Sequence, residues 1–221
     1  RTSDGHNINL WQVGSSKLRD IALSANGQHI LFAQEDGRVT FINQHTQTRF
    51  TFDQHLATIN SIALSHDGTL ALTGSSDYTA YLWQTGTGKI LQRFVHPNRV
   101  VKVALSSAHD LVVTADSQHN TTVWQVTNGK KMSLLARGDK KTFFNHMSIS
   151  ANGKHLLTAS TSRTIDLWHV ATGKNIQTLY ITPKAKVKPL TAVVYSARFM
   201  SEQYIQSFSS AGNLEQWKIQ Q

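Results

Sequence analysis

The sequence predicts an all-β protein, a β-propeller made of four-stranded antiparallel blades within one domain over residues 1–221. The first observation is a period near 41 residues, marked by Leu82-Trp83-Gln84, Val123-Trp124-Gln125 and Leu167-Trp168-His169. A repeat of about 40 to 45 residues is the size of a four-stranded blade. The second observation is that short apolar segments and polar turns recur at matching places within each copy.

The first strand of each repeat is an alternating apolar stretch such as Ile62-Ala63-Leu64. It ends at one turn that is used three times: Ser24-Ala25-Asn26-Gly27, Ser65-His66-Asp67-Gly68 and Ser150-Ala151-Asn152-Gly153. Asn-Gly and Asp-Gly pairs tolerate the positive φ angles that a tight hairpin needs. We therefore expect a hairpin between the first and second strands of each blade.

The other three strands follow in the same order in each copy. The second strand is an apolar segment (70–73, 111–114 and 156–159), and after another polar turn the third strand carries the tryptophan. A turn of the Thr-Gly-Lys type then leads to a short outer strand such as 90–94. Four strands joined by three hairpins complete a blade.

The tryptophan-equivalent positions predict about five complete blades plus an N-terminal partial strand. They fall at residues 11, 42, 83, 124, 168 and 217. Residues 6–13 closely resemble residues 119–126, which favours the third strand of an earlier blade and a six- or seven-bladed ring with residues missing here. In the alternative, residues 6–13 are the outermost strand of the last blade and close a five-bladed ring.

One copy carries a polar set with a recognisable spacing: His55, Thr73, Asp77 and Trp83. An indole N–H only donates, a hydroxyl can accept and pass on a hydrogen bond, and a carboxylate can anchor an imidazole. The set resembles the buried network of the WD-repeat family, and the resemblance extends over essentially the whole chain. It implies a structural role for these residues, and multiprotein assembly as the general function.

The other copies depart from the family pattern. Gln118 stands where the network has Asp, Ser162 replaces Asp before Trp168, and Ile42 replaces Trp. We interpret the chain as a set of divergent blades. This divergence, together with the absence of cysteine, favours a bacterial exported or cell-envelope protein over a cytoplasmic one.

Composition fits a folded β body. Hydrophobic residues make up 39% of the chain and the mean hydropathy is −0.30. No apolar run approaches the ~18 residues that a transmembrane helix requires. The absence of cysteine excludes disulfides and thiolate metal sites.

Positive charge is concentrated in the second half of the chain, within a net charge of +9. Residues 111–221 hold 13 Lys and Arg against 5 Asp and Glu, whereas residues 1–110 hold 9 against 8. The two longest inter-blade connections lie in the second half, and in a propeller such connections emerge on the same face as the turns between second and third strands. We expect a basic, partly aromatic patch there: Arg137, Lys140, Lys141, Phe143, Phe144, Arg163, Tyr180, Lys184, Lys186 and Lys188.

The patch predicts a non-enzymatic interaction scaffold that binds an acidic or phosphorylated protein partner. A peripheral anionic membrane surface is a further partner of the same charge. Nucleic acid is not favoured, because no recognition motif accompanies the basic charge. No catalytic or phosphate-binding motif occurs, and the histidines lack metal-ligand spacing, so we expect no catalytic residue, metal or cofactor. The alternative function is a propeller enzyme or small-ligand sensor that uses the central funnel.

Overall fold

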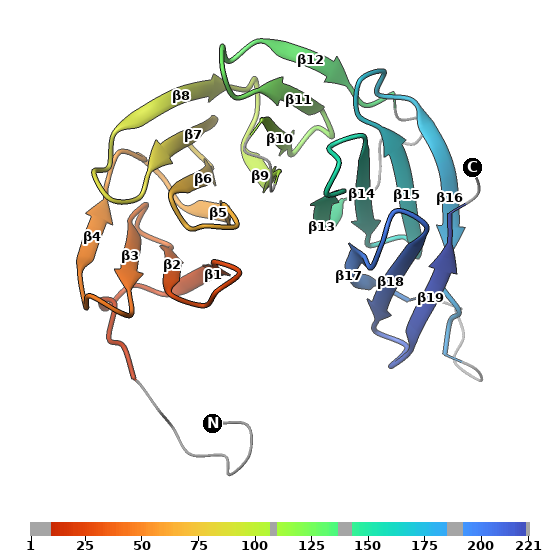
Figure 1. The fold of residues 1–221 in the computed structure, drawn as a ribbon, viewed down its shortest axis with the longest axis horizontal. Helices are drawn as coiled ribbons and strands as arrows, with labels where there is room; N and C mark the ends of the chain where they lie inside the picture. The colour runs from red at the N-terminus through yellow and green to blue at the C-terminus, as the bar shows by residue number, and fades with distance from the viewer. Residues whose placement is uncertain (1–9, 107–109, 137–142, 185–191, 220–221) are drawn as a thin grey trace.

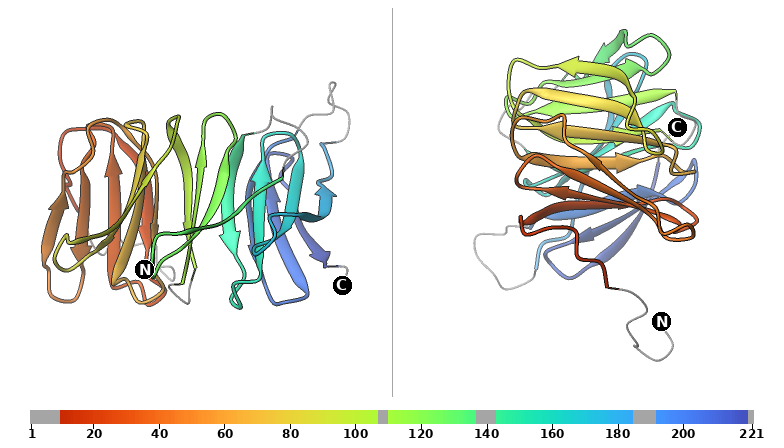
Figure 2. Two further views of the ribbon diagram at one scale, coloured as in Figure 1. Left: turned by 90° about the horizontal axis from the view of Figure 1, so that it is seen from above. Right: turned by 90° about the vertical axis from the view of Figure 1, so that its left-hand side faces the viewer.

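The computed structural model describes residues 10–106, 110–136, 143–184 and 192–219, in which nineteen strands form five antiparallel sheets. Four sheets have four strands and the fifth has three. Each sheet is one blade, and the blades follow one another around an arc that does not close (Figure 1). Side views show the sheets standing face to face along this arc (Figure 2). The predicted all-β propeller fold is confirmed.

The strands have the following bounds. The first two blades comprise β1 (Leu18–Leu23), β2 (His29–Gln34), β3 (Val39–Asn43), β4 (Arg49–Phe52), β5 (Ile59–Leu64), β6 (Leu70–Ser75), β7 (Thr79–Gln84) and β8 (Ile90–Val95). The next two comprise β9 (Val100–Leu105), β10 (Leu111–Asp116), β11 (Thr121–Gln125), β12 (Lys131–Leu134), β13 (Phe144–Ile149), β14 (His155–Ser160), β15 (Thr164–His169) and β16 (Asn175–Tyr180). The fifth comprises β17 (Val194–Phe199), β18 (Tyr204–Ser209) and β19 (Leu214–Lys218).

Within each blade, the strands lie in chain order from the centre of the arc to its outside. The innermost strands β1, β5, β9, β13 and β17 contact one another in sequence, so they form the wall of a central channel (Figure 1). This order follows from the short hairpins, because two antiparallel strands joined by a tight turn must be neighbours.

The predicted turn between the first and second strands is confirmed. In the second blade, the Ser65 hydroxyl donates to Asp67 Oδ1 at 2.6 Å and accepts the Leu70 N–H at 2.9 Å. Gly68 follows with a φ of 76°, a conformation that glycine adopts without strain. Ser150 makes the same two bonds in the fourth blade. The short side chains therefore close the hairpin without help from the rest of the protein.

The hydrophobic core lies between blades. Between the second and third blades, for example, Leu72 and Leu82 pack against Val100 and Val103. Equivalent clusters join the other neighbouring pairs of described blades. Because an inner blade is covered on both faces, its strands are apolar on both faces rather than on one.

The outward face of the first blade has no sheet against it. Leu18 and Ile21 in β1 are 54% and 55% exposed, whereas their equivalents Ile59 and Ile62 in β5 are 0% and 7% exposed. The first blade thus has, on its outward face, apolar side chains that are buried at the equivalent positions of the second blade but partly exposed here.

The described part of the segment 6–13, residues 10–13, covers part of that face, and the expected strand does not form there. Its last four residues have no strand conformation, and Trp11 and Val13 pack against a buried cluster around Ile30. Its first four residues lie outside the described part of the chain. Residues 10–13 therefore do not form the outermost strand of the last blade, which would close a five-bladed ring. They do not form the third strand of an earlier blade either. Instead, Trp11 and Val13 are partly buried against the first blade, while Leu10 is 88% exposed.

The fifth blade corrects the expectation of about five complete blades. It has three strands in the described residues, so four blades are complete. After β19, the Ile219 N–H donates to the Gln203 carbonyl at 2.8 Å, and the Ile219 side chain is buried between the fourth and fifth blades. Thr85, Val126 and Val170 make the same main-chain bond after the third strand of the complete blades, so this end of the fifth blade is built as in the others.

The two equivalent isoleucines test the assignment of the open face. Ile62→Ala is expected to destabilise the protein by about 3 kcal/mol, because it leaves a cavity between blades. Ile21→Ala is expected to cost less than about 1 kcal/mol, because the side chain is half exposed. Urea unfolding of both variants measures the difference. Equal losses would show that another surface covers the first blade in solution.

Candidate partner-binding face and central channel

The connections between blades and the turns between second and third strands form one face, which we call the connection face. The turn after β14 links two connections on it. The Thr161 N–H donates to the Phe143 carbonyl at 3.1 Å, and the Ile181 N–H donates to the Arg163 carbonyl at 3.0 Å. The described ends of the two long connections therefore lie beside Arg163.

Five of the ten residues expected in the basic patch lie outside the described residues. They are Arg137, Lys140, Lys141, Lys186 and Lys188. The other five are placed by the structure, and they have different roles.

Phe144 is not a surface anchor, which corrects the expectation from sequence. It is the first residue of β13 and is 7% exposed, packed in the cluster between the third and fourth blades. Its neighbour Phe143 is 50% exposed, and its ring lies 4.8 Å from that of His119. Alternation along a strand explains the difference, because successive side chains point to opposite sides.

Arg163 supports the loops from within the face. It has a φ of 67°, and its Nη2 donates to the Ile181 carbonyl at 3.2 Å. Tyr180, at the end of β16, is 65% exposed, and Lys184 is exposed as well. Of the described patch residues, Phe143, Tyr180 and Lys184 present side chains outward.

Two further exposed side chains on this face were not identified from the sequence. Leu56, in the connection between β4 and β5, is 94% exposed, and Tyr78, in the turn between β6 and β7, is 51% exposed. Alignment of the repeats could have indicated Tyr78, because it sits at the turn position that Gly37, His119, Arg163 and Gly212 hold in the other copies.

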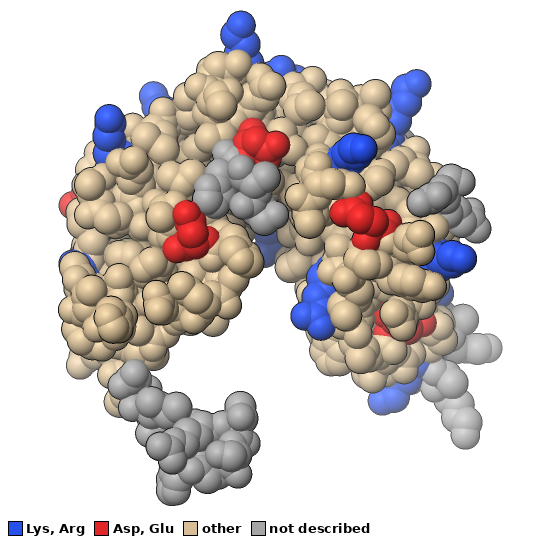
Figure 3. Space-filling view, in the orientation of Figure 1, with Lys and Arg blue, Asp and Glu red and all other residues tan. Residues whose placement is uncertain are grey.

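The opposite face consists of the remaining hairpin turns, and we call it the hairpin face. Figure 3 shows this face, with Lys and Arg mostly standing out from the outer edge of the arc. The described basic side chains are spread around it and do not form a cluster, so this face offers no compact basic site in the described residues.

The expected polar network in the second blade joins three of its four members. His55 contacts Asp77 Oδ2 through Nδ1 and Thr73 Oγ1 through Nε2, both at 2.8 Å. Asp77 also accepts the Leu56 N–H at 3.0 Å and the Thr79 hydroxyl at 2.6 Å. Burial raises the pKa of Asp77, but the bonds from His55, Thr79 and Leu56 together lower that pKa well below its ordinary value. The carboxylate therefore stays charged and fixes the loop before β5.

Trp83 differs from the expectation. It is fully buried, but its indole N–H has no hydrogen-bond partner among the described residues, whereas the Trp168 indole donates to Thr158 Oγ1 at 2.9 Å. The Trp83 ring instead stacks on Phe52, with centroids 4.4 Å apart and an interplanar angle of 3°. It contributes to the core through this stacking.

The third blade has a network carboxylate that the sequence alignment missed. Asp116, two residues before Gln118, is 1% exposed and accepts the Gln118 N–H at 2.9 Å, and its Oδ2 lies 3.9 Å from His96 Nδ1. Thr114 Oγ1 contacts His96 Nε2 at 2.7 Å and accepts the Trp124 indole at 2.8 Å. Burial lowers the pKa of His96, opposed in part by Asp116.

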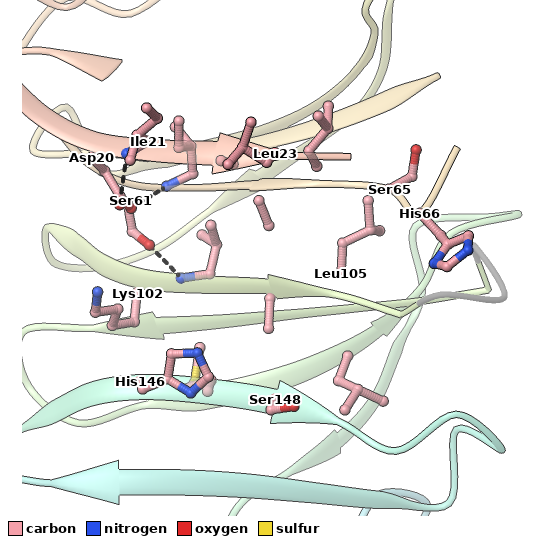
Figure 4. A pocket seen from close by; sticks show the side chains of 18 residues that line it. Asp20, Ile21, Leu23, Ser61, Ser65, His66, Lys102, Leu105, His146 and Ser148 are labelled. Carbon is pink, nitrogen blue, oxygen red and sulfur yellow. Dashed lines mark hydrogen bonds between the residues drawn. The ribbon is translucent and has the colours of Figure 1, made fainter. Parts of the chain in front are cut away.

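The inner strands also place a set of polar side chains in the central channel. Each inner strand has a β-bulge, and the equivalent residues there are Asp20, Ser61, Lys102, His146 and Ser196. The first four line a cavity of about 510 Å³ between β1, β5, β9 and β13 (Figure 4). The sequence analysis missed this set because its members differ chemically; only the repeat register relates them.

Two of these residues accept main-chain hydrogen bonds from the next blade. Asp20 Oδ2 accepts the Ile62 N–H at 3.0 Å, and Ser61 Oγ accepts the Val103 N–H at 3.4 Å (Figure 4). The other Asp20 oxygen accepts the Ile21 N–H at 2.9 Å. Side chains in the channel thus help to hold successive inner strands together.

No group of three or more His, Cys, Asp or Glu side chains that could hold a metal ion occurs in the described ranges. The described residues also contain no helix long and apolar enough to cross a membrane.

Comparison with known proteins adds a family match and a structural match. The family model described as "WD domain, G-beta repeat" matches residues 46–84, which include the network of His55, Thr73 and Asp77. Among solved structures, the β-propeller domain of Cps50 (Swd1) from Myceliophteria thermophila is similar, with a TM-score of 0.72 and 17% sequence identity. The match covers 88% of this chain and 62% of that domain. No curated protein sequence matches.

Five face-to-face antiparallel sheets around a channel define a β-propeller whose loops form its accessible surface. The described residues therefore form a β-propeller, and residues 46–84 match the repeat of WD40 propellers. Such propellers generally act as scaffolds for protein interaction, and usually without enzymatic activity.

Proposed function

We propose that this protein is a non-enzymatic scaffold that binds an acidic or phosphorylated segment of a protein partner through its connection face. The supporting observation is the set of large, exposed side chains that this one face presents: Leu56, Tyr78, Phe143 and Tyr180, each at least half exposed. They project from blades whose cores are tightly buried, so they can bind with little reorganisation of the scaffold.

Charge supports an acidic partner over a neutral one. Lys184 is exposed on this face near Tyr180, and the two long connections contribute most of the basic excess of the second half of the chain. Aromatic side chains provide contact area, while Lys and Arg orient and accelerate the encounter with a negative segment. An anionic membrane surface would match the positive charge of this face. The exposed aromatic side chains favour a protein segment instead, because its side chains can pack against them.

A peptide-display selection on the intact chain tests this proposal. Selected binders are expected to be rich in Asp and Glu or to bind more tightly once phosphorylated, and their affinity should fall steeply with salt. The double variant Tyr180→Ala, Lys184→Glu is expected to weaken binding about tenfold or more.

Lys130→Glu is the matched control, because Lys130 is exposed in a turn on the hairpin face. It makes the same charge change as Lys184→Glu and should leave binding unchanged. Binders without acidic enrichment, or equal loss in the control and the double variant, would refute an acidic partner at the connection face.

A further inference from the structure

The hydrogen bonds from channel side chains to the next inner strand are not continued at Lys102. Asp20 and Ser61 accept an N–H of the next inner strand, but a lysine ammonium has only donors. Lys102 lines the channel and is half-buried. Within the described part of the chain, no carboxylate lies at ion-pair distance from it. Its ammonium group therefore has no ion-pair partner among the described residues, although the Asp20 carboxylate lines the same cavity.

Asp20 and His146 are the charged and titratable groups that line the cavity with Lys102, apart from His66 near the far mouth. Asp20 lines the same cavity, but both of its oxygens already accept main-chain N–H groups. His146 is on the adjacent strand, and its buried Nδ1 has no hydrogen-bond partner in the described residues. Burial and the Lys102 charge lower the pKa of His146, and the Ala197 main chain and the Asp20 charge only partly oppose this. Lys102 is therefore the cation beside this imidazole, which an anion bound to Lys102 would help to protonate, and the Asp20 carboxylate of the same cavity is already engaged by main-chain N–H groups.

The other end of the channel is lined by more aliphatic side chains. Along the same strands, the wall becomes aliphatic, with Leu23, Leu64, Leu105 and Ile149 near the far mouth, beside Ser65 and His66. Figure 4 shows Lys102 and His146 at one end and Leu23 and Leu105 toward the other. A cavity of about 510 Å³ is within the size range of small-molecule sites.

We propose that the central channel binds a small carboxylate with a short apolar body, its carboxylate against Lys102 beside His146 and its apolar part toward Leu64 and Leu105. Lys102 supplies the attraction, and the aliphatic end selects against fully polar anions. This site lies among the inner strands, whereas the proposed partner site is made of loop residues on the connection face.

Butyrate is a suitable probe, and the imidazole of His146 reports on it directly. The Cε1–H signal of His146 is followed by NMR and assigned by its loss in His146→Gln. At constant ionic strength, butyrate is expected to shift this signal and to raise the pH at which His146 titrates. Half-saturation should be on the order of millimolar, because the ligand has few atoms.

Lys102→Met is expected to weaken butyrate binding at least tenfold, because it removes the charge and keeps the length of the side chain. Lys102→Arg should retain binding, which separates loss of charge from damage to the fold. Lys130→Met is the matched control on the hairpin face and should bind as the unmodified protein does.

Three results would overturn the proposal. Chloride at the same ionic strength could shift the His146 signal as far as butyrate does. Lys102→Met, folded as shown by its NMR spectrum, could bind butyrate with undiminished affinity. Phosphate could bind where butyrate does not, which would exclude a ligand with an apolar body.

Discussion

Replacing Asp77 by alanine is expected to destabilise the protein by about 3 kcal/mol at neutral pH. The carboxylate accepts hydrogen bonds from His55, from the Thr79 hydroxyl and from the Leu56 main chain. Its removal leaves the His55 imidazole buried beside an empty position and releases the loop before β5. Chemical denaturation at pH 7 measures the loss, with Asp53→Ala, an exposed carboxylate on the same face, as the matched control at less than about 0.5 kcal/mol.

The stability difference between the unmodified protein and Asp77→Ala is expected to depend on pH. The pKa of Asp77 is lower in the folded state than in the unfolded chain, so the stabilisation that it provides is fully present above about pH 4. It is lost as the pH falls through the folded-state pKa. The difference in unfolding free energy between the unmodified protein and Asp77→Ala should therefore shrink below pH 4. A difference that stays constant down to pH 2 would contradict the assigned network.

Trp83→Ala is expected to cost about 4 kcal/mol, the largest effect of a single core truncation in this protein. Its side chain is fully buried and stacks on Phe52 between the first and second blades. The loss should appear in thermal or urea unfolding as a shift of the whole transition, because the residue lies in an inter-blade core. A cost below about 1 kcal/mol would show that these two blades are not packed as described.

Trp83→Phe and Trp168→Phe form a matched pair. The Trp168 indole donates to Thr158, whereas the Trp83 indole has no partner in the described residues. Phenylalanine keeps most of the ring but not the N–H, so Trp168→Phe should cost about 1 kcal/mol more than Trp83→Phe. The reverse order would mean that the Trp83 indole has a partner, such as an ordered water.

Much of the fold could be predicted because each repeat carries its own local signals. The Ser65 to Gly68 turn forms through bonds among its own residues, and the tryptophan strand follows at a fixed distance. The resemblance on His55, Thr73 and Asp77 also located the network, and the family match covers the same residues. The segment 6–13 was misjudged because its likeness to residues 119–126 says which residues are apolar, but not which surface buries them.

The candidate sites were harder to predict. The grouping of the long connections with Arg163 followed from blade topology alone. Whether an aromatic side chain points outward did not: Phe143 is exposed and Phe144 is core, although they are adjacent. Asp116 replaces the missing carboxylate at Gln118 from a position two residues earlier, and its burial is visible only in three dimensions.

The sequence by itself determined the repeat, the strand order within a blade, the hairpin turns and the excess of basic charge in the second half. These properties depend on residues that are near one another in the chain. The tertiary structure alone decided which faces remain open and which side chains meet in the channel. Asp20, Ser61, Lys102 and His146 lie about 40 residues apart in turn and are four different residue types, so only the stacking of blades, with one bulge at the same register in each inner strand, brings them together.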